Sequence, residues 1–146
     1  MRSDAWEQAY VEFVTARQTH LRRVAFAICG DWDVADGVLQ HALTRLYVVW
    51  PQIQREGAEE AFVRRVIVRA RLDSPVGRTA PDDTTPMFAA LQALPVRQRK
   101  VAVLHHWLGL SLEETAHELG ASTGAVRTLA ERALAELGGS LPQETR

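Results

Sequence analysis

The sequence predicts an all-α protein made of two small helical domains joined by a flexible linker. Through most of the chain, apolar residues recur three and four positions apart, which is the spacing of one helical face. Residues 74–85 lack this period and are rich in Pro, Asp and Thr, which is typical of a linker. We therefore expect one helical domain over residues 1–73 and another over residues 86–140, each with its own core and neither with a strand.

The first domain is expected to begin with two helices. Ser3 is predicted to cap the first helix, and the second is predicted to continue from about Thr19 to Gly30. The apolar faces of the two helices are formed by Trp6, Ala9, Tyr10, Phe13 and Val14, and by Leu21, Val24, Ala25 and Ile28.

Two further helices complete this predicted domain. A capped turn at Asp31-Trp32-Asp33 precedes a helix over about residues 33–50, which Pro51 ends because proline has no backbone N–H. After a loop, a fourth helix is expected over residues 58–72.

The second domain is expected to begin with two short helices. Pro86 begins one that extends through Leu94, and Pro95 begins another that extends to about Trp107. Proline is suited to both positions because its fixed φ matches the first turn of a helix and its missing N–H is not needed there.

A helix-turn-helix pattern follows in residues 108–127. Ser111 can cap a helix, and Glu114, three residues later, completes a capping box. Gly120 lies where the helix end favours a left-handed residue. Two short capped helices around such a turn form a device that reads a DNA groove. The alternative is a helical hairpin that only packs a core.

The second helix of this pattern is expected to begin at a cap formed by Ser122 or Thr123. Its predicted apolar face is formed by Val126, Ala130, Ala133, Leu134 and Leu137.

The composition limits the cellular compartment and the class of protein that the sequence can represent. The chain of 146 residues carries a formal charge of −1 and one cysteine, Cys29, which excludes an internal disulfide and fits a reducing compartment. No apolar stretch approaches the ~20 residues that cross a bilayer, and the N-terminus lacks a signal-peptide core. We expect a cytoplasmic protein with no membrane partner.

Chemical motifs for catalysis are missing from the sequence. No histidine pairs with Cys29 at metal-ligand spacing, no glycine-rich phosphate loop occurs, and no carboxylate pair has a nucleophile beside it. We expect no enzyme, no cofactor and no metal. Basic residues instead form clusters, which suit phosphate contacts: Arg64, Arg65, Arg69 and Arg71, and Arg97, Arg99 and Lys100.

Two strings resemble a known family. Residues 35–43, Ala-Asp-Gly-Val-Leu-Gln-His-Ala-Leu, are similar to a stretch that usually reads A-E-D-L-V-Q-E-A-F in region 2 of sigma-70 factors. Residues 90–99, Ala-Leu-Gln-Ala-Leu-Pro-Val-Arg-Gln-Arg, are close to the opening of region 4, A-L-x-x-L-P-x-R-Q-R. With the two-part layout, the chain resembles the extracytoplasmic-function (group 4) sigma factors of actinobacteria, in somewhat degenerate form.

The resemblance implies a function in transcription initiation. Asp36 and Gln40 would dock on the beta-prime coiled coil of core RNA polymerase, and region 4 would also contact the beta flap. Residues implied in minus-10 DNA binding are Arg64, Arg65 and Arg69. Residues implied at the minus-35 element are Arg97, Arg99, Lys100, Ser122, Thr123, Arg127, Thr128 and Arg132. An anti-sigma factor is a further candidate partner.

Departures from the family pattern support a second hypothesis. Gly37 and His41 stand where the family has acidic residues, Glu131 lies on the reading helix, and the arginine-rich tail is missing. These features favour a degenerate sigma-like adaptor that acts through protein contacts, with weak or no promoter recognition. A dimeric helix-turn-helix repressor that acts without polymerase is a third alternative.

Overall fold

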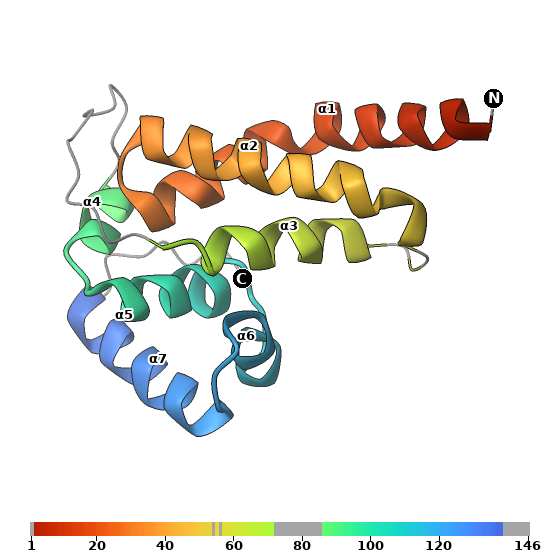
Figure 1. The fold of residues 1–146 in the computed structure, drawn as a ribbon. Helices are drawn as coiled ribbons and strands as arrows, with labels where there is room; N and C mark the ends of the chain where they lie inside the picture. Colours follow the sequence, from red (N-terminus) through yellow and green to blue (C-terminus); the bar gives the residue numbers. More distant parts are fainter. Residues whose placement is uncertain (1, 54, 56, 72–85, 139–146) are drawn as a thin grey trace.

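The computed structural model of the protein describes residues 2–53, 55, 57–71 and 86–138, with side chains described from Ala5 onward. Every regular element in these ranges is a helix, as the sequence predicts (Figure 1). The elements are α1 (Arg2–Cys29), α2 (Trp32–Val49), η1 (Trp50–Gln52), α3 (Ala58–Val68), α4 (Pro86–Gln92), α5 (Val96–Val101), η2 (Ala102–Trp107), α6 (Leu112–Leu119) and α7 (Thr123–Leu137). The predicted linker, 74–85, and the predicted Ser3 cap lie outside the described residues and side chains.

α1 is one continuous helix where the sequence predicted two. The intervening segment, Thr15-Ala16-Arg17-Gln18-Thr19, contains neither Gly nor Pro, so nothing in it interrupts the helical hydrogen bonds. The helix ends where Gly30 adopts a φ of 79°, a left-handed conformation that only glycine reaches without strain.

α2 returns alongside α1, and α3 packs against both (Figure 1). The predicted cap is present, because Asp31 Oδ1 accepts a 3.0 Å hydrogen bond from the amide of Val34. Pro51 lies in η1, directly after α2. α3 ends at Val68, a few residues before the predicted boundary.

In the second half, α5 continues into η2, a short π-helix. The amide of Leu108 donates to the carbonyl of Val103, five residues earlier, at 2.9 Å. His105 Nδ1 lies 2.7 Å from the carbonyl of Leu110, and His106 Nε2 lies 3.0 Å from the carbonyl of Ala130. These contacts attach η2 to the helix-turn-helix formed by α6 and α7.

Residues from both predicted domains contribute to one large buried cluster. Ring contacts show the junction, since Phe26 of α1 stacks on Trp32 at 4.1 Å and meets Phe88 of α4 edge-on at 5.2 Å. α4 has only seven residues, so it buries its apolar side chains against α1. The cluster includes Leu21, Val24, Ile28, Leu46, Ile67, Met87, Phe88, Leu91, Val103, Leu104 and Leu137.

A second, smaller cluster belongs to the helix-turn-helix and α5 alone. Its buried members are Val101, Ala116, Val126 and Ala130. This small core sets the angle between α6 and α7, while the large cluster fixes the second half on the first. Within the described ranges, no helix has the length and apolar character to cross a membrane.

Candidate nucleic-acid interface

The helix-turn-helix has the capping that its sequence predicts. Ser111 Oγ accepts from the amide of Glu114 at 2.9 Å, and Glu114 Oε1 accepts from the amide of Ser111 at 2.8 Å. This capping box satisfies two amides at the start of α6. Gly120 ends α6 with a φ of 71°, and Ser122 rather than Thr123 caps α7 by accepting from the amide of Ala125 at 3.1 Å.

α7 presents a polar face to solvent. Of the predicted reading residues, Ser122, Arg127, Thr128 and Arg132 are exposed and Thr123 is half-buried. The prediction that Leu134 faces inward is wrong, because it is 54% exposed. It lies seven residues after Arg127 and three after Glu131, so it shares their outward face.

The basic cluster on α5 is divided between surface and interior. Arg97 is exposed, whereas Arg99 donates four hydrogen bonds to main-chain carbonyls, those of Leu91, Ile28, Leu94 and Gln92, at 3.1, 2.8, 3.0 and 3.5 Å. Burial lowers the pKa of Arg99. In this arrangement the guanidinium of Arg99 fastens α5 to the end of α1, and its predicted phosphate contact stays a prediction.

Lys100 lies half-buried beside a hollow of about 310 Å³ at the seam between the two halves. Burial is the first cause of its lowered pKa, and the nearby charges of Arg99 and Arg97 add to the effect. The hollow is lined by Val68, Arg69, Arg97, Lys100, Leu119, Gly120, Ala121 and Leu129. It therefore combines three cations with an apolar floor, a lining that suits the edge of a phosphate-binding surface.

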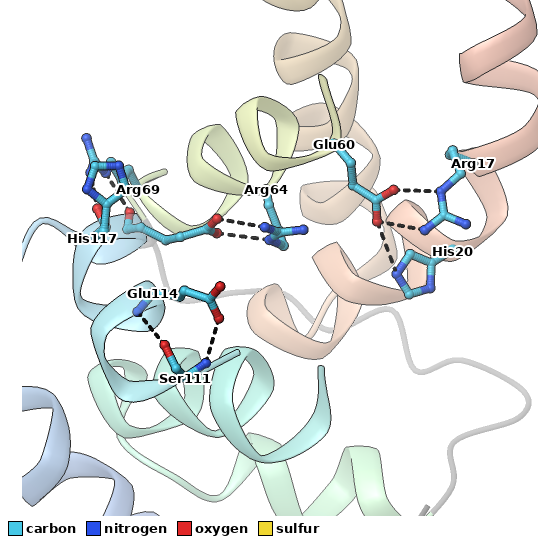
Figure 2. A network of polar contacts seen from close by, with 9 residues as sticks. Arg17, His20, Glu60, Arg64, Arg69, Ser111, Glu114 and His117 are labelled. Carbon is cyan, nitrogen blue, oxygen red and sulfur yellow. Dashed lines mark hydrogen bonds and ion pairs between the residues drawn. The ribbon is translucent and has the colours of Figure 1, made fainter. Parts of the chain in front are cut away.

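Two of the arginines predicted for minus-10 DNA binding face α6 instead (Figure 2). Arg64 forms a two-point ion pair with Glu118, with Nε–Oε1 and Nη2–Oε2 distances of 2.9 and 2.7 Å. Arg69 donates from Nε to the carbonyl of Glu118 at 2.7 Å and from Nη2 to the carbonyl of His117 at 2.8 Å. Burial acts to lower the pKa of Arg64, but the Glu118 hydrogen bond and charge outweigh it and the pKa is raised.

Arg65 lies in a different environment from these two. With Arg45 and His41 of α2 it lines a hollow of about 240 Å³ that also contains Phe62 and Arg69. The Arg45 guanidinium lies 5.8 Å from the centre of the Phe62 ring. The sequence prediction missed Arg45 and His41 here. They are four residues apart on one face of α2, but only the fold shows that this face meets α3.

The predicted polymerase-binding residues lie on the exposed side of α2. Asp36 accepts two hydrogen bonds from Arg22 of α1, Oδ1 from Nε at 2.6 Å and Oδ2 from Nη2 at 3.1 Å. The hydrogen bond from Arg22 lowers the pKa of the Asp36 carboxyl group. Gln40 is exposed, as are Gly37 and His41, so this surface has little net negative charge.

Comparisons with known proteins agree with this architecture. Residues 87–137 match the family described as Sigma-70, region 4. The chain is 34% identical to the RNA polymerase sigma-E factor of Streptomyces coelicolor, over 88% of this chain and 83% of the relative. It is 46% identical over 56 residues to the ECF RNA polymerase sigma factor SigD of Mycobacterium tuberculosis, a match that covers 38% of this chain and 26% of SigD.

Among solved structures, the fold is similar to that of the sigma factor RpoE from Bartonella quintana, crystallised with the anti-sigma factor NepR. The TM-score is 0.69 at 17% identity, over 91% of this chain and 96% of that chain. At this identity the likeness shows the fold alone. The sequence match to the Streptomyces relative, which spans most of both chains, shows that the protein belongs to the sigma-70 family, among its extracytoplasmic-function sigma factors.

Proposed function

We propose that this protein binds core RNA polymerase and directs it to promoter DNA in the cytoplasm, without catalysing a reaction itself. Family membership supports this function. The observation that carries it is the capped helix-turn-helix, in which α7 packs Val126 and Ala130 inward and presents Arg127 and Arg132 to solvent. A helix held in this way can enter the major groove.

At the minus-35 element, the exposed face of α7 would read base edges. Ser122 and Thr123 lie at the start of the helix, where recognition helices approach bases, and Arg127, Thr128 and Arg132 follow along it. Phosphate contacts would come from Arg97 and Lys100, two of the three basic residues that border the seam hollow.

At the minus-10 element, the hollow between α2 and α3 supports binding of unpaired bases. Phe62 offers an aromatic edge, and Arg45 and Arg65 bring positive charge to the same place. Aromatic and cationic side chains together suit single-stranded DNA because bases stack and phosphates pair. Arg64 and Arg69 would join this surface only when α6 releases them.

For polymerase binding, we propose that Asp36 and Gln40 contact the beta-prime coiled coil and that the second half contacts the beta flap. The Arg22 pair holds Asp36 in one orientation, and a basic partner would add to this pair or replace it. An anti-sigma factor is a further proposed partner, since RpoE of similar fold was crystallised with one.

The adaptor hypothesis is retained because the departures from the family pattern are at the surface. Gly37 and His41 are exposed beside Asp36 and Gln40, which weakens charge attraction to a basic partner. Glu131 is exposed on α7 between Arg127 and Arg132, where a fixed negative charge repels phosphate.

Transcription in vitro with purified core polymerase distinguishes these functions. We expect the protein to bind core and to produce transcripts of defined length from a subset of genomic promoter fragments. A variant with Arg127→Gln and Arg132→Gln should bind core equally and lose most of the transcripts. Core binding without any defined transcript would favour the adaptor, and failure to bind core would overturn both.

A further inference from the structure

We infer that Glu118 is an internal substitute for a DNA phosphate, and that the contact of α6 with α3 is an autoinhibitory clamp on the first half of the protein. This inference rests on the proposed function, because it assumes that Arg64 binds DNA. The clamp holds the helix-turn-helix over α3 and occupies Arg64 and Arg69 until α6 leaves (Figure 2).

The geometry of the pair is that of phosphate recognition. An arginine fork binds a carboxylate and a phosphate in the same two-point manner. Both Arg64 donors used here, Nε and Nη2, are taken by Glu118. The same two donors cannot hold a phosphate at the same time, so the clamp and this DNA contact exclude each other.

Burial makes the clamp more than a surface ion pair. The side chains of Arg64 and Glu118 are only 18% and 6% exposed, so water and salt screen their attraction weakly. Breaking one partner of such a pair leaves an uncompensated buried charge. The contact of α6 with α3 therefore depends on the negative charge of Glu118.

Arg69 strengthens the same contact through the end of α6. Its two hydrogen bonds reach the carbonyls of His117 and Glu118, which belong to the last turn of that helix. Carbonyls at a helix C-terminus carry partial negative charge, and that of His117 also accepts from the amide of Gly120 at 3.3 Å. A second arginine predicted for minus-10 DNA is thus also used by α6.

α7 remains outside the clamp. Four of its predicted reading residues, Ser122, Arg127, Thr128 and Arg132, are exposed while α6 is docked on α3. The clamp therefore controls DNA binding by the first half and leaves duplex binding by α7 available. Opening the clamp should therefore change the affinity for single-stranded DNA and leave the affinity for duplex DNA unchanged.

Opening can be measured in the full chain without DNA. Spin labels at Val48→Cys on α2 and Leu134→Cys on α7 occupy exposed positions on the two halves. Native Cys29 is buried and its pKa is raised to about 11, so it reacts slowly with thiol labels. We expect a single distance for the parent protein, and a second, open population that is at least tenfold larger for Glu118→Gln than for the parent protein.

The matched control is Glu113→Gln, which removes the same charge from an exposed position on the same helix. It should leave the distance distribution unchanged. Arg64→Gln should open the protein as Glu118→Gln does, because it breaks the same pair. Thermal unfolding of each variant shows whether it remains folded.

The DNA arm uses a single-stranded oligonucleotide carrying a minus-10 sequence and a duplex carrying a minus-35 sequence. Glu118→Gln should bind the single strand at least tenfold more tightly than Glu113→Gln, with the same affinity for the duplex. Arg64→Gln should open without this gain. Equal single-strand affinities, or no opening by Glu118→Gln, would overturn the clamp while the sigma factor function stands. If no variant binds either DNA or supports transcription, the proposed function itself fails.

Discussion

Arg99 of α5 donates a 2.8 Å hydrogen bond from Nη1 to the main-chain carbonyl of Ile28, in the last turn of α1. Gln92 of α4 donates from Nε2 to the neighbouring carbonyl of Ala27, also at 2.8 Å. The last carbonyls of a helix have no partners within it. The second half of the chain therefore caps the first helix of the first half, and these two side chains tie the halves together beside the shared core.

Replacing Arg99 should destabilise the protein, although Arg99 belongs to a string that resembles a DNA-contacting segment. Arg99→Gln removes the guanidinium that donates to the carbonyls of Ile28 and Leu94, while the carbonyl of Leu91 keeps the amide of Leu94 as a donor at 3.1 Å. The loss should lower the free energy of unfolding by about 2–3 kcal/mol. Urea unfolding measures the change. Arg97→Gln is the control: Arg97 is exposed, so we expect a change within about 0.5 kcal/mol. Equal effects of the two variants would contradict the interior role of Arg99.

Two glycines should respond to alanine in opposite directions. A Cβ at Gly37, on the exposed side of α2, meets nothing within 4 Å, so Gly37→Ala should raise the free energy of unfolding by about 0.5–1 kcal/mol. Gly30 has a φ of 79°, and a Cβ there would lie 2.3 Å from Gln92 Oε1. Gly30→Ala should lower stability by about 2 kcal/mol through backbone strain and displacement of Gln92. Chemical denaturation measures both changes, and a higher free energy of unfolding for Gly30→Ala would contradict the close packing of Gly30 against Gln92.

The start of α7 offers a test of a single cap. Ser122→Ala removes the acceptor for the amide of Ala125 and should cost about 1 kcal/mol. Thr123→Ala changes the next residue, which does not supply the cap, and should change stability by less than about 0.5 kcal/mol. Thermal unfolding of the two variants gives the comparison. A larger loss of stability for Thr123→Ala than for Ser122→Ala would show that Thr123, not Ser122, caps α7.

Some features of the structure can be predicted from residues that lie close together in the sequence. The capping box of Ser111 and Glu114 and the left-handed Gly120 follow from residues a few positions apart, and the structure confirms them. The Leu134 error arose because apolar character alone does not say which side of a helix is covered. Arg127 and Glu131 lie on the same face of the helix as Leu134, and their charges indicate that this face is exposed.

Contacts between the halves had no local signal. Arg64 and Glu118 are 54 residues apart, and each has the sequence context of an ordinary surface charge. The resemblance to region 4 predicts Arg99 as a phosphate contact together with Arg97 and Lys100, yet Arg99 is the member of the cluster that faces α1. Such pairings depend on how α4 and α5 dock on α1, which periodicity within either half does not determine.

The last prediction concerns pH and His20. This side chain is half-buried on α1, with its ring 6.5 Å from that of Trp107 and Nε2 3.9 Å from Glu60 Oε2. Burial lowers the pKa of His20 below 6.5, the charge of Arg17 lowers it further, and Glu60 opposes both effects.

Because the pKa is lower in the folded state, the unfolded chain binds the proton first as pH falls. Above the unfolded pKa of 6.5 the imidazole is neutral in both states and contributes nothing. As pH falls below that value, the free energy of unfolding should decrease until pH passes the folded pKa. Urea unfolding between about pH 7.5 and pH 5 should therefore show a smaller decline for His20→Gln than for the parent protein. The same slope in the parent protein and in His20→Gln would show that His20 is not desolvated at this junction of α1, α3 and η2.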